Sequence, residues 1–145
     1  MMVVAEAARL AGVDNIHIGT VIGKLAGDKN EVLPINDHIE KQNVKEDKKL
    51  HLLGEKWGKM KPVMSASSGG LHPGLVPEIL SMLGNDIAIQ IGGGTHGHPK
   101  GTIAGAKAVM QAIDASMNNI SLKEYAKTHK ELQQALDTWG FIRPK

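Results

Sequence analysis

The stretch Ile87-Ala88-Ile89-Gln90-Ile91-Gly92-Gly93-Gly94-Thr95 indicates the fold of this 145-residue chain most directly. A short, mainly apolar run that ends in Gly is typical of a buried strand, and three consecutive glycines follow this one. An Ala-rich helix is predicted next, from about residue 102 to 117. A strand, a glycine turn and a helix in this order form the repeating unit of a parallel α/β sheet.

Two similar units precede this one in the chain. Residues 62–64 are predicted to be a strand that ends in a Ser/Gly-rich loop, and residues 73–83 a helix with Pro73 in its first turn. Residues 16–18 are a third strand candidate, and a loop with glycines follows it. Residues 31–60 indicate only short helical runs. Three strands cannot close a barrel, so they form either a small open sheet or part of an eight-stranded barrel.

The ends of the chain are predicted to be helical. A helix with small apolar residues at helical spacing begins near Met2, and nothing in the sequence precedes it to cap it. This start predicts that the chain is one piece of a larger unit. A further helix is predicted at residues 122–138.

The composition excludes several classes of function. The chain has no cysteine, which excludes disulfides, thiolate metal sites and a cysteine nucleophile, and is compatible with a reducing cytoplasm. Its formal net charge of +2 does not favour nucleic-acid binding. No apolar run approaches the roughly 20 residues that span a membrane. We therefore expect a cytoplasmic protein that binds neither nucleic acid nor membrane.

The glycine turns are candidate phosphate sites. Gly92 and Gly93 let the backbone approach a ligand and direct N–H groups toward an anion, although a tight turn alone explains the triplet equally well. The run Ser68-Gly69-Gly70 ends the preceding strand at the same edge of the sheet. Because two neighbouring strand ends of a barrel commonly hold one phosphate together, the pair favours phosphate binding.

The other candidates are ambiguous from residue type alone. Lys24 lies in a loop flanked by glycines that can close over a ligand, but a lone lysine is more often a surface residue. His17 points to the opposite strand face from its Ile neighbours, and a lone strand histidine is more often part of a core. His96 and His98 lack the i, i+4 spacing and the carboxylate neighbours of a metal site. No metal site is predicted within the chain.

Three motifs together resemble one family. Residues 16–27 (IHIGTVIGKLAG), 67–74 (SSGGLHPG) and 90–101 (QIGGGTHGHPKG) resemble the sixth, seventh and eighth strand ends of the ribulose-1,5-bisphosphate carboxylase (RuBisCO) large subunit of the archaeal type. They occur in the family's order and spacing. The resemblance implies a fold that is the C-terminal part of a TIM (β/α)8 barrel, about strands 6–8, over residues 1–118. A C-terminal helical extension over residues 119–145 completes the expected organisation.

The resemblance also implies roles for individual residues. Lys24 matches a lysine that stabilises the carboxylate formed from CO2, and His17 a histidine that contacts one phosphate of ribulose 1,5-bisphosphate. Ser68 matches a serine that hydrogen-bonds the sugar. The loop glycines match a site for the other phosphate, a set that comprises Gly69, Gly70, Gly92 and Gly93.

The magnesium ligands of the family have no match in this chain. The carbamylated lysine, Asp and Glu that bind Mg2+ in the family are expected outside this chain, in a missing N-terminal portion or a homo-oligomer of large subunits. The isolated chain is therefore predicted to be inactive, as one part of a carboxylase that uses CO2 or O2. A RuBisCO-like isomerase or enolase fragment is an alternative, although that group usually lacks the loop lysine. A non-catalytic phosphate-binding remnant is another.

Overall fold

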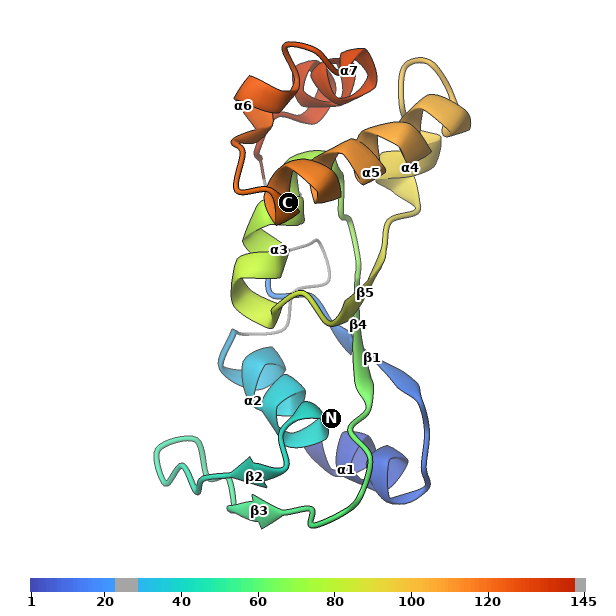
Figure 1. Ribbon diagram of the computed structural model, residues 1–145. Helices are drawn as coiled ribbons and strands as arrows, with labels where there is room; N and C mark the ends of the chain where they lie inside the picture. Colours follow the sequence, from blue (N-terminus) through green and yellow to red (C-terminus); the bar gives the residue numbers. More distant parts are fainter. Residues whose placement is uncertain (23–28, 143–145) are drawn as a thin grey trace.

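Three parallel strands form the centre of the molecule. The computed structural model describes residues 1–22 and 29–142, so Lys24 lies outside the described residues. Strands β1 (Asn15–Gly19), β4 (Met64–Ser68) and β5 (Ile87–Gln90) are hydrogen-bonded in the order β1-β4-β5 (Figure 1). Both pairings are parallel, which confirms the predicted type of sheet.

The central strand lies further along the sequence than we predicted. Residues 62–64 were expected to form it, but β4 runs from Met64 to Ser68, so the predicted serine loop is the strand itself. Ser65 and Ser67 have no exposed surface. Hydrogen bonds to a neighbour on each side hold β4 extended, although it lacks the β-branched residues that favour strands. Tertiary pairing overrides local sequence preference here.

Helices cover one face of the sheet. Figure 1 shows α2 (Lys29–Glu40) and α3 (Val76–Leu83) on the same side of the strands, and α1 (Met2–Leu10) lies near their amino ends. A buried apolar cluster joins these helices to the sheet, and it includes Ala5, Ile18, Ile35, Ile39, Val63, Leu75 and Ile79. Because successive strand side chains alternate, His17 and Ser68 lie on the other face.

The region between β1 and β4 is more ordered than the sequence indicated. It forms one long helix and a small antiparallel ribbon, namely α2, β2 (Asn43–Val44) and β3 (Glu55–Lys56). Arg9 of α1 holds these parts together, because its Nη1 donates to the carbonyl oxygens of His38 at 2.9 Å and Lys41 at 2.8 Å. Its guanidinium also lies 4.5 Å from the ring centre of Trp57.

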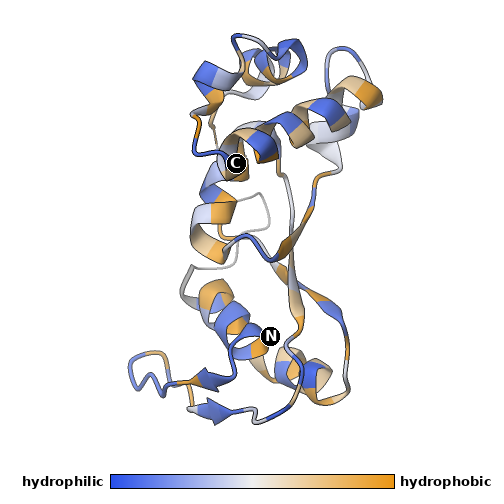
Figure 2. Cartoon of the chain, viewed as in Figure 1, coloured by the Kyte–Doolittle hydropathy of each residue, from blue (hydrophilic) through white to orange (hydrophobic). Residues whose placement is uncertain are grey.

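The helices after β4 and β5 agree largely with prediction. A 3-10 turn (Pro73–Leu75) leads into α3, so the predicted helix at 73–83 is confirmed. Helix α5 (Thr102–Met117) matches the predicted residues. In Figure 2, apolar and polar residues alternate along α3 and α5, as they do when one side of a helix packs and the other meets solvent.

The single helix predicted at 122–138 is wrong. The chain forms α6 (Leu122–Tyr125) and α7 (Lys130–Trp139), which are separated by a turn. The turn lets Leu122 of α6 and Leu132 of α7 enter the same buried cluster against α5. Both helices therefore pack against α5 on either side of the break. The boundary at residue 118 stays a prediction.

Candidate functional site

The carboxyl ends of β1 and β4 bring two predicted site residues together. His17 Nδ1 and Ser68 Oγ lie 3.0 Å apart, within hydrogen-bonding distance. His17 is opposite Ala66 in the parallel register, and the register shifts between His17 and Gly19. The His17 side chain is exposed, so it is not the enclosed core histidine that residue type alone favoured.

The loop after β4 requires glycine. Gly69 has φ of +118° and Gly70 has φ of +67°, values that residues with a Cβ rarely adopt. Gly70 is exposed, and its N–H forms no backbone hydrogen bond among the described residues. This N–H is therefore free to bind a ligand from the open side of the loop.

The turn after β5 is partly helical, which we did not predict. Gly93 opens a short helix, α4 (Gly93–His96), and Gly92 is its N-cap. The carbonyl oxygen of Gly92 accepts from Thr95 N and His96 N, while the Gly92 N–H makes no backbone hydrogen bond to a described residue. Both Gly92 and Gly93 are exposed, and the first N–H groups of a helix point out of its end. The geometry thus still presents unpaired donors.

The two glycine-rich loops touch each other. Gly94 is buried, and a Cβ added there would lie 2.5 Å from the carbonyl oxygen of Leu71 and 2.6 Å from the Cα of His72. Both distances are too short for real atoms, so only glycine allows this approach. Sequence reasoning treated Gly94 as part of the glycine triplet and missed its role as the contact between the loops.

Helix α7 braces both loops. Trp139 stacks on His72 with ring centres 5.9 Å apart, and its edge meets His98 at 6.4 Å. His72 Nε2 donates to the carbonyl oxygen of Ile142 at 2.9 Å, and His98 Nε2 donates to that of Glu131 at 3.0 Å. The sequence indicated that His98 shapes its loop, but it did not reveal Trp139 as the residue between the two histidines.

Burial keeps His72 neutral. Desolvation lowers the pKa of His72, and its hydrogen bond to the Ile142 carbonyl opposes this only in part. Its Nδ1 is buried without a partner, so a proton there would be an unsatisfied donor. His72 is therefore a neutral structural donor beneath the loops.

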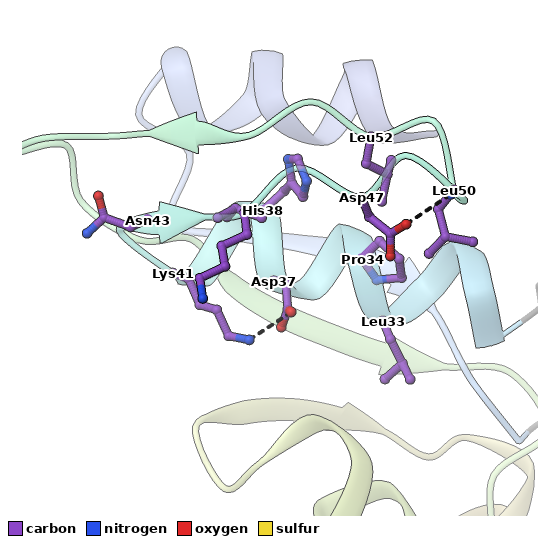
Figure 3. Close-up of a pocket in the computed structure, with 11 residues that line it drawn as sticks. Leu33, Pro34, Asp37, His38, Lys41, Asn43, Asp47, Leu50 and Leu52 are labelled. Atoms are coloured by element: carbon purple, nitrogen blue, oxygen red, sulfur yellow. Dashed lines mark hydrogen bonds and ion pairs between the residues drawn. The ribbon is translucent and has the colours of Figure 1, made fainter.

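The pocket in Figure 3 lies away from these loops. It has a volume of about 530 Å3 between α2 and the ribbon segment, with Leu33 and Leu52 among its apolar walls. Three of its charged groups already have partners, since Asp37 and Lys41 form an ion pair at 2.7 Å and Asp47 Oδ1 accepts from nearby backbone N–H groups. None of the described candidate residues lines it, so we do not assign the chemistry to it.

Residues 1–22 and 29–142 contain neither a cluster of three potential metal ligands nor a helix that could cross a membrane. No three His, Asp or Glu side chains within this range gather closely enough to hold a metal ion. The described residues therefore do not provide three clustered protein ligands for Mg2+. No described helix has both the length and the apolar character needed to cross a membrane.

Comparison with known proteins extends this picture. The family model for the ribulose bisphosphate carboxylase large chain, catalytic domain, matches residues 1–139. Ribulose bisphosphate carboxylase of Methanosarcina barkeri is 48% identical over 139 residues, which are 96% of this chain and 32% of that protein. The chain thus spans about a third of the length of the curated relatives that it matches.

Solved structures agree. A crystal structure of an archaeal RuBisCO aligns with a TM-score of 0.89 and 45% identity, covering 99% of this chain and 33% of the other. The dimeric enzyme of Hyperthermus butylicus aligns with a TM-score of 0.86 and 44% identity, covering 96% of this chain and 32% of the other. The octameric enzyme of Pyrococcus horikoshii aligns with a TM-score of 0.83 and 44% identity, covering 97% of this chain and 30% of the other. By its family match and this similarity of sequence and fold, the chain belongs to the RuBisCO large-chain family, within the catalytic domain.

Proposed function

We propose that this chain is the part of a ribulose-1,5-bisphosphate carboxylase that holds the substrate phosphates and supplies the loop lysine. The complete enzyme adds CO2 to ribulose 1,5-bisphosphate and yields two molecules of 3-phosphoglycerate. The observation that carries the proposal is the meeting of His17, Ser68 and two touching glycine loops at the carboxyl edge of one parallel sheet. Ligands of parallel α/β proteins bind at this edge.

Each residue has a distinct proposed task. The exposed N–H groups near Gly69, Gly70, Gly92 and Gly93 bind one phosphate as hydrogen-bond donors, and His17 contacts the other. Ser68 bonds a sugar hydroxyl. Lys24 stabilises the carboxylate that forms when CO2 adds to the substrate, since a cation near developing negative charge lowers the barrier.

The three units fit an eight-stranded barrel. Among the described strands, β1 and β5 each pair with β4 only, so each has one open edge. In a barrel, further strands of the enzyme pair with both edges. In such a barrel, the sheet face with His17 and Ser68, which is opposite the helices, would line the interior.

Other groups complete the reaction. Mg2+ would supply charge stabilisation to the reaction when it is bound, and we expect its ligands in other parts of the enzyme, because no three His, Asp or Glu side chains gather among the described residues. Two structural relatives are described as dimeric and octameric, which supports a homo-oligomer of large subunits. The proposed location is the cytoplasm.

Substitution of Lys24 tests the proposal in the full-length protein that contains this sequence. Lys24→Ala should reduce carboxylation by roughly 10²–10³-fold, the usual effect of losing one preorganised group. Enolisation, measured as exchange of the substrate C3 proton with solvent, should fall far less because it precedes CO2 addition and uses groups outside this chain.

The rates of carboxylation and of C3 proton exchange together distinguish the possible roles of Lys24. If both fall equally, Lys24 only positions the substrate or closes the loop. If neither falls, the match of Lys24 to the family's loop lysine is wrong. Lys123→Ala is a matched control, because that lysine lies on α6 beside Phe141 and away from β1, β4 and β5.

A further inference from the structure

The contact between His17 and Ser68 allows two arrangements of hydrogen. A neutral imidazole carries one N–H and one acceptor nitrogen, and a serine hydroxyl carries one hydrogen. Either the hydroxyl donates to Nδ1 and Nε2 carries the imidazole proton, or Nδ1–H donates to the hydroxyl oxygen. The heavy atoms, 3.0 Å apart, are the same in both cases. The arrangements differ in what they offer a ligand.

The chemistry of the two groups favours the first arrangement. An imidazole nitrogen is far more basic than a hydroxyl oxygen, so it is the better acceptor. The two residues come from adjacent parallel strands and lie on the face away from the helices, and His17 is exposed. Among the described residues, no other partner is found for the Ser68 hydroxyl, so its hydrogen is available to His17.

We propose that Ser68 is a positioning residue for His17 as well as a ligand contact. Its hydroxyl donates to His17 Nδ1 and holds the imidazole as the Nε2–H tautomer. Nε2–H then faces the open side as a hydrogen-bond donor. This tautomer does not depend on the proposed function, although its consequence for substrate does.

The consequence is a specificity rule for the sugar. Once its hydrogen is committed to His17, Ser68 meets a ligand with lone pairs only. It therefore accepts from a sugar hydroxyl and disfavours a carbonyl oxygen at that place, since two acceptors would face each other. The pair offers a donor for phosphate from His17 and an acceptor for a hydroxyl from Ser68.

Nuclear magnetic resonance of the 145-residue chain tests the tautomer without any ligand. Long-range 15N–1H spectra at about pH 8, where histidine side chains are generally neutral, separate the two tautomers of each ring. His17→Gln identifies the signal of His17 among the seven histidines. The wild-type ring should be almost entirely Nε2–H.

The Ser68 variants then isolate the hydroxyl. Ser68→Ala should convert the single tautomer into a mixture, and Ser68→Thr should retain it because the hydroxyl remains. Ser68→Cys keeps the size of the side chain but is a weak donor, so it should also give a mixture if Ser68→Ala fails to fold. Ser81→Ala is the control, because that exposed serine of α3 donates only to the Glu78 carbonyl among the contacts described.

Two results would overturn the inference: a wild-type His17 with its proton on Nδ1, or a ring that is unchanged in both Ser68→Ala and Ser68→Cys. Titration with inorganic phosphate addresses the proposed function separately. A fixed tautomer without phosphate binding refutes the phosphate site and leaves the role of Ser68 intact.

Discussion

At the scale of single residues, Gly93 offers a direct test of the phosphate site. A Cβ added at Gly93 meets no atom within 4 Å, so a larger side chain there leaves the fold intact. The same side chain covers the N–H groups of the turn. Gly93→Val should therefore abolish the binding of inorganic phosphate measured by calorimetry, with no change in the thermal midpoint.

The neighbouring glycine provides the contrast. Gly94→Ala should lower the thermal midpoint, because its Cβ would overlap the carbonyl oxygen of Leu71. Phosphate binding that survives in Gly93→Val would count decisively against the assigned site.

Glu40 makes stability depend on pH. Desolvation by burial raises the pKa of Glu40, and the hydrogen bond from Asn36 Nδ2 opposes the shift. The folded chain therefore binds the proton more tightly than the unfolded chain does. Stability is fully present below the unfolded pKa near 4.5 and is lost as the pH rises through the higher folded value.

Replacement of the Glu40 carboxyl group tests the direction of this pH dependence of stability. Glu40→Gln should remove that loss and make the variant relatively more stable at neutral pH than at acidic pH, as followed by urea denaturation across this range. The exposed Glu124→Gln, on α6, should leave the pH dependence unchanged. A Glu40→Gln profile parallel to that of the wild type would contradict the assignment.

At the scale of elements, α7 should control the spacing of the two glycine loops. Trp139 lies between His72 and His98, and the Gly140 carbonyl packs so closely on Gly74 that no Cβ fits there. Trp139→Ala should shift the amide resonances of both loops together and weaken phosphate binding, although Trp139 is proposed to touch no ligand.

A nearby aromatic residue is the control for this prediction. Phe141 is half exposed, so Phe141→Ala should leave the loop resonances almost unchanged. If Trp139→Ala shifts only one loop, α7 braces that loop alone and the coupling between them comes from Gly94.

At the scale of the whole molecule, the described part of the sheet has open edges. We predict that the 145 residues alone fix no measurable CO2 on ribulose 1,5-bisphosphate, with or without Mg2+, in a labelled-CO2 assay. Among the described residues, no three potential metal-ligand side chains cluster together, and β1 and β5 each lack a second partner strand. Fixation above a heat-killed control would refute this.

The same edges predict association. Unpaired strand edges attract further strands, so size-exclusion chromatography with light scattering should show complexes larger than one chain. A stable monomer at all concentrations would mean that the edges are protected in solution.

The sequence by itself determined the alternation of strands and helices, the parallel sheet and the opposite faces of His17 and its Ile neighbours. These follow from local periodicity and from the glycines that end each strand. It also placed Ser68 and Gly92 at the ends of neighbouring strands, because the carboxyl ends of parallel strands share one edge.

Only the tertiary structure decided which serines form the central strand, where the last predicted helix breaks, and how the loops meet. The serines of β4 are extended because β1 and β5 pair with them, and the break between α6 and α7 serves the packing of Leu122 and Leu132. Gly94 and Trp139 matter through contacts with His72, which is distant from both in sequence. Such contacts arise from packing between segments that are remote in sequence, and local residue patterns do not predict them.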